Sequence, residues 1–235
     1  MAPKIIFEDD YLMVVNKPSG VITTKATTTT NQPTFQEWLE TRQYPLSRDF
    51  ERRSGIVHRL DKETSGLIIV AKQLDVFFKL QALFKNRLVQ KTYMALVHGI
   101  VEPKQGVIDA QVGRLPWNRE RFGVLAGGRD ARTQYKVLTV FKKDKEKFTL
   151  VAVKPKTGRT HQIRIHFKYL GHPVVGDTFY AGRKTSRKDR EWCPRLFLHA
   201  YEIEFEHPIA QKRLSVNAEI PLELKKATSV LKKIS

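Results

Sequence analysis

The chain has 235 residues, of which 41% are hydrophobic, and this fits one large domain or two small ones. With 42 Lys and Arg against 24 Asp and Glu, the formal net charge is +18, so nucleic acid is the expected partner. The single cysteine, Cys193, excludes an internal disulfide and a cysteine-based zinc cluster. We expect a cytoplasmic protein without a membrane partner, because no apolar run approaches the roughly 20 residues of a spanning helix and a strand pattern starts too early for a signal peptide.

The first forty residues predict two short strands, a loop and a helix. Residues 5–7 and 12–15 are short apolar runs that predict strands, and the Pro and Gly of segment 16–20 end the second one. The Thr-rich stretch 21–33 predicts a loop. Thr34 is a suitable N-cap for a helix that extends through Arg42.

A polar turn at residues 58–66 precedes an apolar run, 67–71, that predicts a buried strand. Asp61 lies between Arg59 and Lys62 in this turn. Nearby positive charge favours the ionised carboxylate, which suits a nucleophile or an electrostatic stabiliser. The alternative is a charged loop that only caps the strand.

The middle of the chain is mostly strands by pattern. An apolar stripe predicts a helix over 74–87, and strands are predicted over 91–99, 106–113, 131–141 and 148–153. Between two of them, Trp117 and Phe122 stand among arginines, a composition suited to stacking on bases. The alternative is that both rings pack inward.

The last third predicts a short helix between Thr160, as its N-cap, and Gly171, with His161, Arg164 and Lys168 on one face. The segment 182–190 holds five basic residues and is expected to be flexible and to contact phosphates. A strand over 195–205, a short strand near 214–220 and a basic helix from Leu222 follow.

Strands that cluster, rather than alternating with helices, indicate the α+β class. We expect a mostly antiparallel or mixed central sheet, flanked by helices and loops, in a single catalytic domain over 1–235.

Five segments together resemble, in order, motifs of the RluA-type pseudouridine synthases: residues 16–20, 58–66, 91–99, 158–177 and 195–208. The resemblance covers nearly the whole chain. It implies a pseudouridine synthase fold and an enzyme that isomerises uridine in structured RNA to pseudouridine, without a cofactor or a metal.

The resemblance also implies roles for particular residues. Asp61 is the nucleophile or the activator of the glycosidic bond, Arg164 pairs with Asp61 and orients it, and Tyr93 stacks on the target base. Without the family, Tyr93 would be read as a core aromatic. Substrate or RNA contacts are assigned to five further residues: Lys17, His58, Arg59, Arg159 and His161.

Two departures from the family are visible. Many relatives carry a small RNA-binding domain before the catalytic one, whereas this chain begins with the catalytic pattern, so its own basic surface is expected to bind RNA. Members often carry a His where 21–25 stands here.

The expected partner is ribosomal RNA, of the large subunit, with transfer RNA as an alternative, and the protein is expected to be a monomer. A different class of function is a catalytically idle protein that binds RNA or assists ribosome assembly. A base-excision glycosylase would also use a lone Asp, but it would need a wedge and a helix-hairpin-helix that the sequence does not show.

Overall fold

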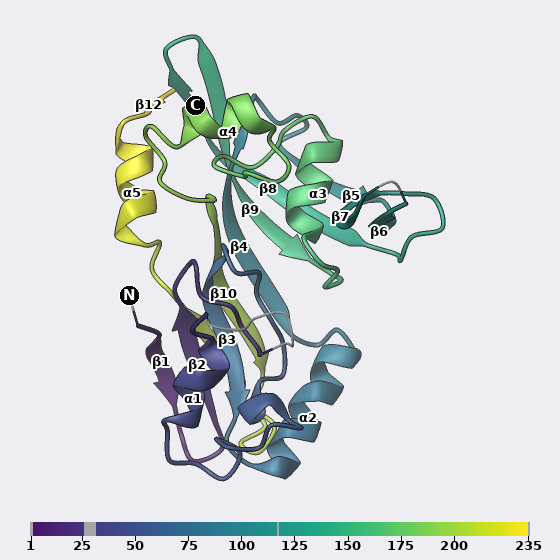
Figure 1. The fold of residues 1–235 in the computed structure, drawn as a ribbon, viewed down its shortest axis with the longest axis vertical. Coiled ribbons are helices and arrows are strands. Elements are labelled where there is room, and N and C mark those ends of the chain that lie inside the picture. The colour runs from purple at the N-terminus through teal and green to yellow at the C-terminus, as the bar shows by residue number, and fades with distance from the viewer. Residues whose placement is uncertain (1, 26–31, 117, 235) are drawn as a thin grey trace. The chain divides into compact units, whose positions relative to one another are not determined.

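The computed structural model describes residues 2–25, 32–116 and 118–234, which form two compact units (Figure 1). Unit 1 takes in Met1–Lys91 and Ala200–Glu219, and unit 2 takes in Thr92–His199 and Ile220–Ser235. The chain therefore passes three times from one unit to the other. The predicted site residues Lys17, His58, Arg59 and Asp61 belong to unit 1, and the others belong to unit 2.

Unit 1 is built on a sheet whose strands lie in the order β1, β2, β3 and β10, with β11 paired to β10. The pairs β1 with β2, β2 with β3 and β10 with β11 are antiparallel. Their bounds are β1 Lys4–Glu8, β2 Leu12–Lys17, β3 Ser65–Ala71, β10 Leu198–Glu206 and β11 Arg213–Asn217. All seven residues of β3 are buried, as the apolar run predicts. The loop that carries Asp61 is therefore joined to a strand inside the sheet.

Three short helices accompany this sheet: α1 (Phe35–Glu40), α2 (Leu74–Lys85) and a 3-10 turn at Arg53–Gly55. Thr34 caps α1 through a reciprocal capping box with Glu37, which confirms the predicted helix start. The stripe that predicts α2 is the face it buries, with Val76 and Leu80 fully inaccessible.

Unit 2 contains the antiparallel order β4, β9, β8 and β12, with β5 paired to β8 and a separate hairpin of β6 and β7 (Figure 1). The strand bounds are β4 Gln90–His98, β5 Gln105–Asp109, β6 Val112–Leu115, β7 Asn118–Val124, β8 Arg132–Lys143, β9 Glu146–Pro155 and β12 Lys232–Lys233. The helices are α3 Gln162–Tyr169, α4 Arg183–Asp189 and α5 Leu222–Ser229. A core cluster that includes Leu96, Phe148 and Phe197 holds α5 through Leu224 and Leu231.

The structure confirms the predicted α+β class, with helices packed on antiparallel strands. It divides the strand predicted over 106–113 in two, because the ladder with β8 ends at Asp109 and Val112 pairs with Val124 instead. It also moves the start of α3. His161, in a left-handed conformation with φ 56°, precedes the helix where Thr160 was expected to cap it.

The prediction that segment 182–190 is flexible is wrong, because most of it forms α4. Buried Asp189 anchors this helix: its Oδ2 accepts a hydrogen bond from the Gly176 amide at 2.8 Å and lies 3.0 Å from His98 Nε2. Trp117 and residues 26–31 of the Thr-rich stretch lie outside the described residues. Within the described ranges, no helix is long and apolar enough to cross a membrane.

Candidate active site

The loop that carries Asp61 leads into β3, a strand of unit 1 that pairs with β2. Lys17, the last residue of β2, is the register partner of Gly66 in β3, and the loop enters β3 at that point. Asp61 is half-buried, and its own carbonyl accepts a hydrogen bond from the Thr64 amide at 3.1 Å, which closes a turn. The carboxylate is thus presented from a short turn that leads directly into the sheet.

Hydrogen bonds from segment 18–23 hold this turn on both sides of Asp61. On one side, Thr23 Oγ1 donates to the Leu60 carbonyl at 2.6 Å. On the other, the Gly20 amide donates to the Lys62 carbonyl at 2.8 Å, and Ser19 Oγ donates to the Glu63 carbonyl at 2.6 Å. A side chain supported in this way keeps its geometry before substrate arrives, as a catalytic group requires.

Lys17 lies beneath the same turn. It is fully buried, and its ammonium donates to the carbonyls of Pro18 at 2.9 Å, Val21 at 2.8 Å and Lys62 at 3.4 Å. A buried charge needs such acceptors to offset the loss of water. This burial does not support the predicted RNA contact of Lys17; instead, the ammonium ties segment 18–21 to the Asp61 loop.

His58 also faces the protein, whereas Arg59 is exposed. The Ile69 amide donates to His58 Nε2 at 2.9 Å, so the ring is neutral with its proton on Nδ1. Burial, with the charge of Lys91 as a second cause, lowers the pKa of His58 to about 3. His58 therefore fastens the start of the loop to β3, and Arg59 is the more exposed residue of this pair.

Gly66 explains why the motif ends in glycine. Its φ is +120°, and a Cβ at this position would lie 2.3 Å from the carbonyl oxygen of Ala200 in β10. Only glycine permits this backbone conformation and this close approach of the two strands.

In unit 2, the central feature is a buried ion pair between Arg164 of α3 and Asp177. Arg164 Nε donates to Asp177 Oδ2 at 2.7 Å, and Nη2 donates to Oδ1 at 2.8 Å. The exposed side-chain fractions are 2% and 0%. Oδ1 also accepts the amides of Phe179 at 2.9 Å and Tyr180 at 3.0 Å, so Asp177 fixes a turn as well. The predicted pairing of Arg164 with Asp61 stays a prediction.

The start of α3 is fixed to β8 by Gln162. Its Oε1 accepts from the Arg159 amide at 3.0 Å, and its Nε2 donates to Thr133 Oγ1 at 2.9 Å. Four residues on, His166 Nδ1 lies 2.9 Å from the same hydroxyl, and burial lowers the pKa of this imidazole. Arg159 is half-buried, and its Nε donates to the carbonyl of Asp130 at 3.0 Å.

His161 belongs to an aromatic group next to this helix. Its Nδ1 lies 2.9 Å from the Tyr180 hydroxyl, and its ring contacts those of Phe122 and Phe179 edge-on. Tyr180 in turn lies under the guanidinium of Arg164, whose Cζ is 5.1 Å from the ring centroid. Phe122 of the hairpin packs against this group, which supports the inward alternative for that ring.

Tyr93 lies on β4, opposite Val153 of β9, and is 9% exposed. Such burial is ordinary for a core aromatic, so its stacking role stays a prediction. Among the described residues, no three His, Cys, Asp or Glu side chains gather as metal ligands would.

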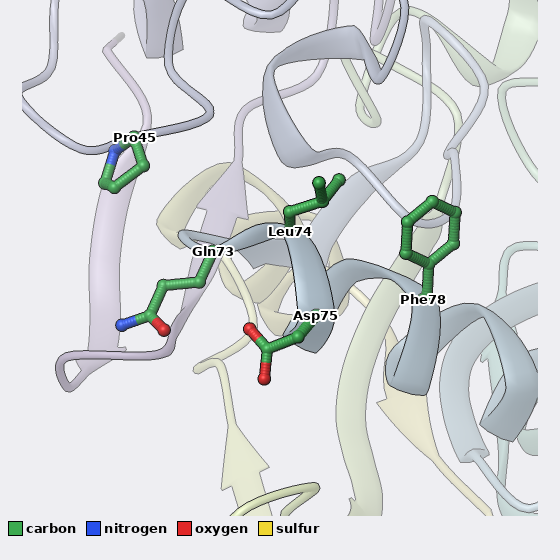
Figure 2. Close-up of a pocket in the computed structure, with 5 residues that line it drawn as sticks. All are labelled: Pro45, Gln73, Leu74, Asp75 and Phe78. Carbon is green, nitrogen blue, oxygen red and sulfur yellow. The ribbon is translucent and has the colours of Figure 1, made fainter.

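A pocket of about 640 Å³ in unit 1 lies elsewhere, around the start of α2 (Figure 2). It is lined by Pro45, Gln73, Leu74, Asp75 and Phe78, none of which is a predicted site residue.

Sequence reasoning missed the groups that hold the predicted ones. Thr23 and Gln162 are uncharged and stand outside any charge pattern, although both lie within or beside the segments that carry the resemblance. Asp177 is not among the predicted site residues. Its position within the segment 158–177 was the available signal for a partner of Arg164.

Residues 11–169 match the family model described as RNA pseudouridylate synthase. Ribosomal large subunit pseudouridine synthase D of Nitrosomonas europaea is 38% identical over 93% of this chain, which spans 62% of that relative. Ribosomal large subunit pseudouridine synthase C of Vibrio cholerae is 34% identical over 97% of this chain, which spans 69% of it.

The solved structure of human RNA Pseudouridylate Synthase Domain Containing 1 has the same fold. It aligns with a TM-score of 0.78 and 26% identity, and the match covers 100% of this chain and 89% of that one. These matches confirm the resemblance drawn from the motifs, and the chain belongs to the RNA pseudouridylate synthase family.

Proposed function

We propose that this chain is an RNA pseudouridine synthase. The reaction breaks the bond between N1 of uracil and C1′ of the ribose and forms a bond between C5 and C1′. The C5 proton leaves, and N1 gains a proton, so the reaction is an isomerisation. The observation that carries the proposal is the family match over residues 11–169, which takes in Asp61, Tyr93 and Arg164 together.

Asp61 acts at the glycosidic bond as nucleophile or activator, and the braced turn supports this role because it holds the carboxylate still. Arg164 orients the carboxylate through a charge-assisted hydrogen bond. Tyr93 stacks on the uracil after the nucleotide leaves its helix, which replaces stacking worth about 1–3 kcal/mol per base.

RNA contacts fall to Arg59, Arg159 and His161, which are exposed or half-buried. For Lys17 and His58 we propose positioning roles instead, because the backbone of the Asp61 loop and of β3 occupies their polar atoms. The protein needs no cofactor and works as a monomeric catalytic domain in the cytoplasm, and its +18 charge supports RNA affinity.

The proposed substrate is large-subunit ribosomal RNA, because several relatives are named ribosomal large subunit pseudouridine synthases. Transfer RNA is the alternative substrate. A catalytically idle RNA-binding protein is the alternative of another class, and the presence of Asp61, Tyr93 and Arg164 argues against it.

The test is a pseudouridine map of total RNA from cells that contain the protein, lack it, or carry Asp61→Asn. The deletion and Asp61→Asn are expected to lose the same uridine modification, and the exposed-site control Asp10→Asn is expected to keep it. The class of RNA that carries the lost position identifies the substrate. A deletion map identical to that of the wild type overturns the proposal.

A further inference from the structure

A basic groove of about 620 Å³ lies in unit 2 between α4 and the end of α3, outside the set of residues with proposed catalytic roles. Nine residues line it: Arg121, Lys168, Thr178, Phe179, Gly182, Arg183, Ser186, Arg187 and Arg190. Five of these carry a positive charge, and none carries a carboxylate. Such a lining attracts a polyanion.

The arginines of α4 are arranged along one face of the helix. Arg183, Arg187 and Arg190 follow i, i+4, i+7 spacing, and all three line the groove. Arg183 and Arg187 form no ion pair with any residue that the structure describes. Lys188, outside the groove, pairs with Glu146 at 2.9 Å. The helix therefore neutralises a lysine on another face and leaves the two groove arginines for an external anion.

The groove is held in shape before any ligand arrives. Ser186 and Asp189 form the buried side of α4, and Asp189 Oδ2 accepts from the Gly176 amide. Arg190 donates to the carbonyls of Pro194 at 2.6 Å and Gly176 at 3.2 Å, and Lys168 Nζ donates to the Tyr180 carbonyl at 3.1 Å. Preorganised cations lose less conformational entropy when they bind.

One exposed aromatic ring connects the groove to Arg164. Phe179 is 39% exposed; the guanidinium carbons of Arg121 and Arg164 lie 5.6 Å and 5.9 Å from its ring centroid. A ring between cations suits an unstacked base or a ribose whose phosphates lie on the arginines. This combination favours a nucleic-acid strand over a small anion, which would not use the ring.

We propose that this groove binds the backbone of the substrate RNA beside the target uridine, with Arg183 and Arg187 on phosphates and Phe179 against a nucleoside. The inference rests on the proposed function for its substrate. It adds a binding subsite that does not touch the reacting atoms.

The test compares Arg183→Gln/Arg187→Gln with a charge-matched control, Lys184→Gln/Lys145→Gln, whose two lysines are exposed and do not line the groove. Binding to an unmodified large-subunit ribosomal RNA transcript is measured at 50 and 200 mM salt, and melting curves check that each variant folds. Each lost phosphate contact reduces the salt slope by about 0.7 on single strands. Two lost contacts therefore predict that the wild type loses affinity about sevenfold more than the arginine variant does over this salt range.

The turnover of the same transcript gives a second readout. In the arginine variant the loss of rate is expected at low RNA concentration and shrinks as RNA approaches saturation, which places it in KM. A salt slope of binding equal to that of the lysine control overturns the groove, whether or not the wild type makes pseudouridine. A different result separates the two proposals: the wild type makes no pseudouridine, but the arginine variant still has a smaller salt slope of binding than the wild type. This result overturns the proposed reaction and leaves the groove as an RNA site.

Discussion

Asp177→Asn tests how far the geometry around Arg164 depends on its buried partner. The substitution keeps the shape of the side chain and removes its charge. Asp177 accepts four hydrogen bonds within 3.0 Å, two from Arg164 and two from backbone amides. An asparagine still accepts at one oxygen, but its amide then faces the N–H groups of the guanidinium, and the buried positive charge loses its counter-ion.

The size of the effect follows from the burial. Removing one partner of a buried pair costs about 3–5 kcal/mol, because the remaining charge is left uncompensated. For a protein of this size, each kcal/mol corresponds to about 2–4 °C in Tm, so the expected fall is roughly 6–20 °C. Exposed pairs contribute about 0–1 kcal/mol. Asp109→Asn, which removes the exposed carboxylate 3.8 Å from Arg132 Nε, is therefore the matched control and leaves Tm nearly unchanged.

The assay is a thermal melt with turnover measured on the same samples at a temperature where each variant is folded. Replacing both partners, Arg164→Met with Asp177→Asn, removes both charges, keeps an oxygen that accepts the Phe179 and Tyr180 amides, and is expected to regain most of the lost stability. Turnover stays lost in this double variant if Arg164 acts in the reaction. A Tm for Asp177→Asn within about 1 °C of the wild type, or a double variant with normal turnover, refutes the reasoning.

Two further predictions concern the Asp61 loop. Thr23→Val leaves the buried Leu60 carbonyl without its 2.6 Å donor, so denaturant unfolding is expected to show a loss of about 1–3 kcal/mol, with reduced turnover. The exposed Thr41→Val is the control, and equal losses in both contradict the account. His58→Gln tests pH dependence: the folded pKa of about 3 lies below the unfolded value, so the unfolded state binds more protons and stability falls with pH below about 6.5. Between pH 7 and 5 the wild type should lose about 2 kcal/mol more than His58→Gln; parallel unfolding curves in pH argue against a buried neutral imidazole.

Much of the fold could be predicted from local pattern. The apolar run 67–71 predicts β3, Val76 and Leu80 of the predicted stripe lie on the buried face of α2, and Thr34 caps α1. Each of these signals depends on residues close together in the chain. The prediction that segment 182–190 is flexible was wrong because it, too, rested on local pattern alone. Its charges hid two buried positions, Ser186 and Asp189, whose burial depends on residues far away in the sequence.

In the candidate site, too, local motifs could be predicted and long-range contacts could not. The motifs located Asp61 and Arg164, but they did not show what holds them. Thr23 is 37 residues from Leu60, and Arg164 is 13 residues from Asp177. Lys17 is a further example: the resemblance implies a substrate or RNA contact for it, whereas the structure buries its ammonium on backbone carbonyls.

The central claim is that Asp61 takes part in converting uridine to pseudouridine, a reaction that releases the hydrogen on C5. The most direct measurement is tritium release from an unmodified large-subunit ribosomal RNA transcript that carries uridine labelled at C5, with purified wild-type protein and Asp61→Asn in single-turnover conditions. The account predicts release by the wild type and none by Asp61→Asn, which still binds the transcript with wild-type affinity. Release at the same rate by both proteins, or no release by the wild type on ribosomal or transfer RNA, contradicts it.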